Sequence, residues 1–420
     1  FSVGEKVSLG LSYNGVTGYR SDDEVSNYRI RPERRNEYEV GSDLSLLNGS
    51  LGLSATAYNA ISSDIIYDVD VTPSTGADEM TANGASIENR GLELNINYKV
   101  IDRNKFKWNS RFIYAANKNM VLEMNGIDGE MAKNLDKNLV PSRGIAKFSE
   151  VSPGHEYAEF KVLTWARFGH DLVVDHDLNI NTEDVNIDTI SNYNWSKNDV
   201  YITSNGLPIM YSEKIWSGYA PNPDWTGSLY NEWNIGKKVQ ITCLLDMSIG
   251  GHIANYTKNS LFEWGTHGET EQRYHPDFDN PDWFGYEENV STEWGKGRFQ
   301  DLLNHGHKAI GPGQDSTIVF SQNMYENYMG RNTDVINNIE DASYMKLREI
   351  SIAYNFGRSK VGFLGDPNIL LRLSAQDLVT WTNYSGWDPE TNMYQDRISG
   401  EDYFNQPQTW RVNLGVQLEW

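Results

Sequence analysis

The chain has 420 residues, and its 58 acidic against 36 basic side chains give a formal net charge of −22, which argues against nucleic acid as a partner. A single cysteine, Cys243, excludes an intrachain disulfide and a cysteine-rich metal centre. No run of about 18 apolar residues predicts a membrane-spanning helix, although a transmembrane β-strand needs only about 9–11 residues of half-apolar sequence.

Ten segments alternate between apolar and polar residues, which is the period-two pattern of a β-strand with two different faces. In GLELNINYKV the even positions from Leu92 to Val100 are apolar and the odd positions are polar or glycine. A phase change between Leu347 and Ile350 predicts a β-bulge. The predicted strands are residues 6–14, 38–47, 50–68, 90–101, 105–120, 225–235, 237–250, 344–356, 368–382 and 409–420.

The connections between these segments are of two kinds. Tight turns such as LLNGSL, with Asn48 and Gly49 as hairpin residues, alternate with long polar stretches that are rich in glycine and aromatic residues. This combination predicts an all-β fold, a transmembrane antiparallel barrel with long extracellular loops. A soluble β-sandwich is the alternative, but loops so uneven would make its core hard to close. The long stretches are residues 15–37, 69–89, 121–224, 251–343 and 383–408.

The two faces of the alternating strands have different predicted surroundings. Apolar side chains on one face would meet lipid, and polar side chains on the other would line an aqueous lumen as solvated wall or as plug contacts. We expect Cys243 on the lipid face. Predicted lipid-facing residues are Leu94, Ile96, Ile241, Leu245, Val416 and Leu418. Predicted lumen-facing residues are Glu93, Lys99, Lys107, Arg111, Gln240, Asp246, Arg372, Gln376, Arg411 and Glu419.

Six motifs occur in a fixed order between residues 30 and 420. They are RPERRNEYEVG, ASIENRGLELNINYKV, FKWNSRFIYAANKNMV, PNPDWTGSLYNEW, ASYMKLREISIAYNF and LLRLSAQDLVTWTNYSGWDPETN. Together they resemble the SusC/RagA type of TonB-dependent outer-membrane transporters of the Bacteroidetes, whereas residues 145–205 match that family poorly. The most specific matches are Ser343, Tyr344, Lys346, Leu347, Arg348, Asp377, Leu378, Tyr384, Gly386, Asp388, Pro389 and Glu390.

The resemblance implies a 22-stranded barrel. Residues 1–420 would be its C-terminal part, about ten strands long, with the plug domain and the N-terminal strands outside this chain. It implies import of an oligomeric nutrient, a glycan or a peptide, through the outer membrane, with a SusD-like surface lipoprotein as lid. TonB would act through the missing N-terminal region. The strand-like start at Phe1 also predicts a piece of a longer protein.

One predicted loop carries the densest candidate chemistry, in the stretch YHPDFDNPDWFGYEENVSTEW. Its carboxylates Asp277, Asp279 and Asp282 are weak candidates for calcium ligands, because their spacing is not that of an EF-hand. Its aromatic side chains could stack on sugar rings or grip a peptide, or else pack the loop or bury against the lipoprotein. These contact candidates are Tyr274, Phe278, Trp283, Phe284, Tyr286 and Trp294.

The remaining features concern assembly and alternative functions. No nucleophile, base or carboxylate pair stands out, so we expect neither an enzyme nor a cofactor. The alternation runs unbroken to the aromatic Trp420, which resembles the signal read by the barrel assembly machinery and suits the membrane interface. Two alternatives stay open at this point: a barrel of the same ancestry that serves as a scaffold in an assembly or secretion complex, and a secreted, soluble glycan-binding β-protein.

Overall fold

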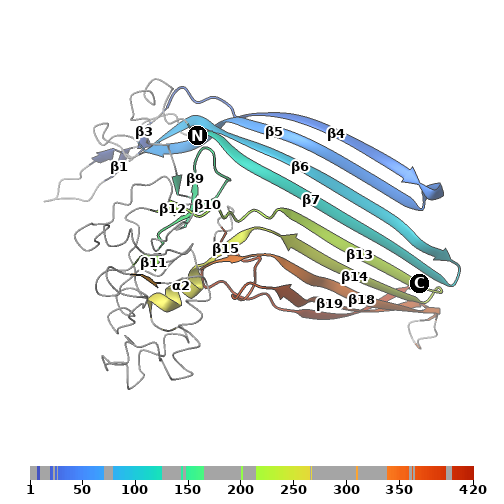
Figure 1. Cartoon of the computed structure of the whole chain (residues 1–420). Helices are drawn as coiled ribbons and strands as arrows, with labels where there is room; N and C mark the ends of the chain where they lie inside the picture. The colour runs from blue at the N-terminus through green and yellow to red at the C-terminus, as the bar shows by residue number, and fades with distance from the viewer. Residues whose placement is uncertain are drawn as a thin grey trace, which may run out of the picture.

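Most of the described chain forms one curved antiparallel sheet whose long strands run side by side (Figure 1). Shorter elements gather at one end of these strands. The computed structural model describes residues 7–9, 19–21, 24–25, 27–70, 79–124, 143–144, 148–164, 200–201, 214–264, 266, 309–310, 338–358, 362, 365–393 and 400–420.

The main sheet has ten strands in the described part of the chain, nine of them long. Their order from edge to edge is β21-β19-β18-β14-β13-β7-β6-β5-β4, and the two-residue β3 (Glu24–Val25) pairs with β6. The long strands are β4 (Arg34–Leu46), β5 (Leu51–Asp70), β6 (Glu79–Arg103), β7 (Phe106–Met124), β13 (Trp225–Ile235), β14 (Val239–Ile249), β18 (Tyr344–Arg358), β19 (Asn368–Thr382) and β21 (Arg411–Glu419).

Nine of the ten predicted segments correspond to these long strands, in the same order. The segment 6–14 is the exception: its described part is β1 (Val7–Leu9), which pairs with β2 (Tyr19–Ser21) outside the main sheet. Alternation indicates that a segment is extended, but it does not determine which strand becomes its partner. The prediction was therefore wrong about the sheet to which this segment belongs.

The strands β5 and β6 are longer than predicted. β6 begins at Glu79, so most of the predicted loop 69–89 is strand, paired with β5 up to Asp70. Register shifts between Ser62 and Ile66 interrupt the alternation there. Because a bulge moves the following side chains to the other face, the period-two signal breaks although the hydrogen-bonded ladder continues.

Tight turns join the strands at one end of the sheet, and the long connections leave from the other end (Figure 1). In the turn η1 (Leu47–Gly49), Asn48 and Gly49 have φ values of 56° and 82°. Asparagine and glycine adopt this left-handed conformation at low cost, which explains why the Asn-Gly pair marks the turn. The predicted hairpin between β4 and β5 is confirmed.

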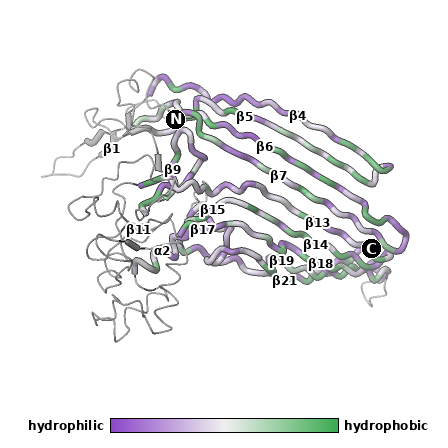
Figure 2. Tube along the Cα trace, in the orientation of Figure 1, coloured by the Kyte–Doolittle hydropathy of each residue, from purple (hydrophilic) through white to green (hydrophobic). Residues whose placement is uncertain are grey.

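The strand register separates two faces. Directly paired residues lie on the same face of a sheet, and Ile96, Phe112, Leu229 and Leu245 form one apolar row across four strands. Asn95, Ile113, Ser228 and Asp246 form the neighbouring row on the opposite face. The register puts all six predicted lipid-facing residues and Cys243 on the first face, and all ten predicted lumen-facing residues on the second. Figure 2 shows the resulting alternation of hydropathy along the long strands.

The polar face is the inner one, because connecting segments fold over it at one end. Lys346, in the row that includes Asp246, is 1% exposed, and Val121 on the same face is fully buried. The phase change predicted near Leu347 is confirmed as a register shift between Leu347 and Glu349 in the ladder with β19. After this shift Ile350 and Ile352 return to the outer face, since they pair with Cys243 and Ile241.

Beyond the strand ends lies a layer of short elements. Its apolar core consists of Phe148, Phe160, Val162, Ala254 and Ile339, and the ring of Tyr256 packs edge-on against Phe148 at 5.2 Å between centroids. The elements are β8 (Arg143–Gly144), β9 (Ser149–Val151), β10 (Glu159–Val162), β11 (Val200–Tyr201), β12 (Ile215–Trp216), β15 (His252–Asn255), α2 (Tyr256–Glu263), β16 (Ala309–Ile310), β17 (Ile339–Asp341) and β20 (Glu401–Asp402).

Among the described residues, no helix is long and apolar enough to cross a membrane.

Spin labels test the assignment of the two faces. In a Cys243→Ala background, we expect labels at Leu94 and Leu245 to collide with oxygen dissolved in lipid, and a label at Glu93 to collide with an aqueous nickel chelate. The physical reason is that a charge on the lipid face at the bilayer midplane costs about 2–4 kcal/mol, so this face must be apolar. Because Glu93 and Leu94 are sequence neighbours, each serves as control for the other. Reversed accessibilities would overturn the assignment.

Candidate functional site

A network of charged side chains on the inner face begins at a strand irregularity. Arg348 of β18 lies where the ladders to β14 and β19 both shift register, and opposite it Asp377 of β19 has a φ of 53°. A bulge turns an additional side chain toward one face. As a result, the Arg348 guanidinium donates to Asp246 at 2.7 Å, to Asp377 at 3.1 Å and to Glu390 at 2.6 Å.

Lys346 lies two residues before Arg348 on β18 and provides the second cation of this network. Its ammonium is 3.1 Å from Asp388, forms a short contact with Glu390 and lies 3.4 Å from the amide oxygen of Gln408. Tyr344 donates its hydroxyl to Glu390 at 2.7 Å. Burying a charge is favourable only with close partners, and here the buried Lys346 and the half-buried Arg348 share carboxylates from three segments of the chain.

Glu390 is the electrostatic centre of the network. Burial raises the pKa of its carboxyl, but hydrogen bonds from Arg348, Lys346 and Tyr344 lower it by more, so that the pKa falls to about 2. The carboxylate therefore stays ionised throughout the physiological pH range. Its charge holds the segment after β19 against the wall strand β18.

The same segment is held a second time, by Tyr384. The hydroxyl of this buried tyrosine donates to Asp402 of β20 at 2.6 Å. The pKa of Tyr384 is raised, mainly because the side chain is buried and also because it lies beside this carboxylate. A Cβ at Gly386 would lie only 2.4 Å from the Tyr384 ring, which explains the need for glycine there. The hydrogen bond from Tyr384 to Asp402 joins the two described parts of the connection between β19 and β21 to each other.

Further contacts join this connection to the other connections at the same end of the sheet. The carboxylate of buried Glu401 accepts from the amide of Phe148 at 2.6 Å, across 253 residues of sequence. Glu340 binds Lys258 at 3.1 Å and accepts from the hydroxyl of Ser385 at 2.7 Å. We call these joined segments, residues 148–162, 215–220, 252–263, 338–342, 384–393 and 400–402, the cap.

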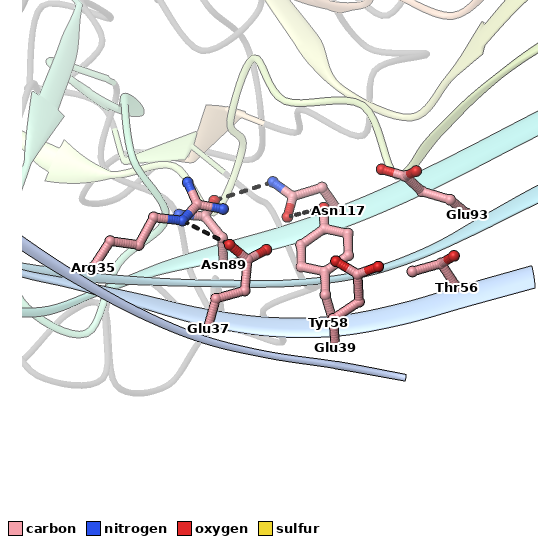
Figure 3. Close-up of a pocket in the computed structure, with 8 residues that line it drawn as sticks. All are labelled: Arg35, Glu37, Glu39, Thr56, Tyr58, Asn89, Glu93 and Asn117. Atoms are coloured by element: carbon pink, nitrogen blue, oxygen red, sulfur yellow. Dashed lines mark hydrogen bonds and ion pairs between the residues drawn. The ribbon is translucent and has the colours of Figure 1, made fainter. Parts of the chain in front are cut away.

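A pocket of about 400 Å³ lies on the inner face of β4 to β7 (Figure 3). The Tyr58 hydroxyl donates to Asn117 at 3.1 Å, and the Asn117 amide donates to Asn89 at 3.2 Å. The Tyr58 ring covers Gly91, where a Cβ would come within 2.5 Å of it. The lining offers amides, carboxylates and one guanidinium, which suit hydroxyl-rich or amine ligands. It consists of Arg35, Glu37, Glu39, Thr56, Tyr58, Asn89, Glu93 and Asn117.

The loop residues singled out from the sequence lie outside the described residues. This holds for the calcium candidates Asp277, Asp279 and Asp282 and for all six aromatic contact candidates from Tyr274 to Trp294. Within the described part of the chain, no group of three His, Cys, Asp or Glu side chains could hold a metal ion together. Trp420 follows β21 and is 74% exposed, and its role as an assembly signal stays a prediction.

The sequence did not predict the charged network as a site. Tyr344, Lys346, Arg348, Asp377, Asp388 and Glu390 appeared only as family motif residues, and Asp246 was expected to be a solvated wall residue or a plug contact. The structure brings all of them together: Asp246 lies on the expected inner face, but its side chain is an ion-pair partner of Arg348, which the sequence did not predict. The sequence did contain one signal for this site, namely the two cations Lys346 and Arg348, two positions apart on a predicted strand. The pocket residues Arg35, Tyr58, Asn89 and Asn117 were also missed.

Comparison with known proteins gives no match to a protein-family model. Among curated proteins, the TonB-dependent receptor P39 of Formosa agariphila is 23% identical over 448 residues, which cover 98% of this chain and 38% of that protein. The TonB-dependent receptor SusC of Bacteroides thetaiotaomicron is 28% identical over 103 residues, which cover 24% of this chain and 10% of SusC. The chain is thus similar over nearly its whole length to proteins named TonB-dependent receptors, and over a shorter stretch to SusC. It spans less than two fifths of the length of the curated relatives it matches.

Solved structures agree on the fold. The match to the RagAB peptide transporter covers 99% of this chain and 38% of the transporter chain, with a TM-score of 0.61 and 14% sequence identity. The RagAB peptide importer in the 'open-open' state matches equally widely, at a TM-score of 0.62. Similarity to TonB-dependent receptors, together with the fold of a transporter, favours the transmembrane barrel over the soluble alternative.

The charged network can be tested through Lys346. Replacing it with Met leaves the buried Asp388 and the partly buried Glu390 without their ammonium partner. Removing one partner of a fully buried pair costs about 3–5 kcal/mol. We expect proteases to cleave the segment 383–408 of this variant although the protein is folded. Folding is checked by the shift in electrophoretic mobility on heating. Lys237→Met, in an exposed turn, is the matched control. Equal protection of both variants would show that the network does not hold the segment.

The pH dependence follows from Glu390. Its pKa is lowered on folding from 4.5 to about 2, so its stabilising contribution is complete above about pH 4.5 and is lost as the pH falls toward 2. We expect pepsin to cleave the segment 383–408 only near pH 2, after normalisation to an unfolded substrate. In Glu390→Gln the protection should already be reduced at pH 4. Cleavage of the unmodified protein at pH 4 would contradict the assignment.

Proposed function

We propose that this chain is part of an importer that uses TonB to move oligomeric nutrients, glycans or peptides, across the outer membrane. The observation that supports this most directly is the match of nearly the whole chain to the RagAB peptide transporter, together with curated relatives named as TonB-dependent receptors. Those relatives are receptors and transporters, and they do not indicate an enzyme. The substrate would be captured at the cap and released by remodelling of a plug.

The main sheet would be the C-terminal part of a 22-stranded barrel. Both of its edges are open in the described chain: all thirteen residues of β4 are exposed, and so are eight of the nine residues of β21. An unpaired strand edge cannot persist in lipid, because its amides and carbonyls would lack hydrogen bonds. The remaining barrel strands would pair with these edges, and the plug domain would fill the lumen beside the pocket of β4 to β7.

A SusD-like surface lipoprotein would close the barrel at the cap. The charged network holds one of the connections that such a lid would meet, because Lys346 and Arg348 bind the segment after β19 to the wall. Retention of an oligomer while the plug rearranges requires closure on the outside. The aromatic residues between Tyr274 and Trp294 are the proposed contacts with the lid or the substrate. A scaffold of the same ancestry would use these surfaces for protein partners alone.

Native purification of the complete natural protein in mild detergent, followed by mass spectrometry, tests the proposal. We expect one stoichiometric lipoprotein and a co-purified glycan or peptide, and the chemical class of that ligand identifies the substrate. Uptake of the ligand should stop in cells without TonB while surface abundance of the barrel is unchanged. Several bound proteins without a ligand would instead support the scaffold. A monomer with neither lid nor ligand would contradict both.

A further inference from the structure

One row of outward-facing residues differs from the apolar rows beside it. Tyr38 pairs with Asn59, Asn59 with Arg90, and Arg90 with Lys118, so these four side chains cross β4, β5, β6 and β7 on one face. No register shift separates Arg90 from Leu94 and Ile96, which places the row on the apolar outer face. Arg90 and Lys118 are both exposed.

The height of this row follows from the strand geometry. Trp108, near the tight turn of β7, packs against Trp233 with ring centroids 6.3 Å apart, and Lys118 follows ten positions later on the same strand. Ten residues at about 3.3 Å each, tilted by about 40°, rise about 25 Å, the height of the apolar band of an outer-membrane barrel. The row therefore lies at the headgroups of the leaflet on the loop side, which is the outer leaflet.

Trp225 marks the same boundary independently. It lies eight positions before Trp233 on β13, and its ring packs against Tyr114 at 5.5 Å between centroids. Aromatic side chains gather at both membrane interfaces of such barrels. Since Thr226 pairs with Ala115, Lys118 lies just beyond this upper aromatic pair. The exposed ring of Tyr38 continues the interfacial band to the sheet edge.

The charges in this row call for an anion. Arg90 and Lys118 are direct cross-strand neighbours, and like charges in this position repel one another. Two carboxylates lie near this pair: Glu88 accepts from the Asn59 amide at 2.7 Å, and Glu156 forms an ion pair with the Lys118 ammonium at 3.9 Å. The distance of this ion pair is too long for a hydrogen bond, so the Lys118 ammonium keeps its donors for a closer anion. In a chain with a net charge of −22, such a cationic pair at headgroup level is not explained by solubility.

We propose that Arg90 and Lys118 together bind the phosphate of an outer-leaflet lipid headgroup. A guanidinium offers a planar fork for phosphate oxygens, and an ammonium adds a point charge with three donors. Asn59 lies beside Arg90 in the same row, and the apolar rows below it, which include Leu92 and Leu94, would contact the acyl chains of the same lipid. The site would hold the barrel at a defined height and attach an ordered lipid to the wall strands β6 and β7.

The test compares two double variants of the complete natural protein in maltoside micelles. Arg90→Gln with Lys118→Gln removes the cationic pair. Lys99→Gln with Arg111→Gln removes the same charges from the same two strands, but from the inner face. Native mass spectrometry counts bound phosphatidic acid and, as a reference, phosphatidylcholine. We expect the first variant to bind phosphatidic acid about tenfold more weakly and the control to bind like the unmodified protein.

Two further measurements complete the test. Lys118→Gln alone should weaken binding of phosphatidic acid partially, which keeps the proposal testable if the double variant inserts poorly. Excess inorganic phosphate should leave the lipid bound, because the acyl chains add affinity that a free anion lacks. Equal binding of phosphatidic acid by all variants would overturn the proposal. So would displacement of the lipid by inorganic phosphate, which would indicate a site for soluble anions.

Discussion

The structure depends on one constraint, the pairing of every backbone amide and carbonyl that would otherwise meet lipid. In β13 all eleven residues pair with β14, and ten of them also pair with β7. Such continuous ladders leave no freedom in register, because a shift by one residue would move every side chain to the other face. The face of each side chain is therefore decided by the ladder, so the apolar outer face and the polar inner face each have a defined set of residues.

The charged network lies at one of the few places where the ladder is interrupted. Between Leu347 and Glu349 the pairing shifts, and Arg348 and Asp377 are turned toward each other on the inner face. The interruption lies next to the end of β18 where the cap begins, beside the buried Lys346. A bulge in the lipid-covered part of the wall would leave backbone groups unpaired, whereas here polar side chains surround it. The irregularity thus links the wall to the segment that folds over it.

The same register gives neighbouring residues unrelated surroundings. Tyr58 lines the pocket on the inner face, while Asn59, the next residue, lies in the outer row with Arg90. On β7, Asn117 and Lys118 divide in the same way, because adjacent side chains of a strand point to opposite faces. The proposed lipid contacts and the lining of the pocket are therefore carried by the same strands without sharing side chains. A substitution on one face can be interpreted largely without reference to the other.

The sequence alone determined the strands and their faces wherever alternation was unbroken, as from Leu92 to Val100, because this pattern is local. It also predicted the bulge after Leu347 and the Asn48-Gly49 turn, which are local features too. It could not determine the partner of segment 6–14, the true start of β6 at Glu79, or the role of Asp246. These depend on which segments meet in space: Glu401 reaches Phe148 across 253 residues, and Lys346 meets Asp388 and Glu390 only because the connection after β19 folds back over the wall. Charge pairs of this kind leave no periodic trace in the sequence, so only the tertiary structure decided them.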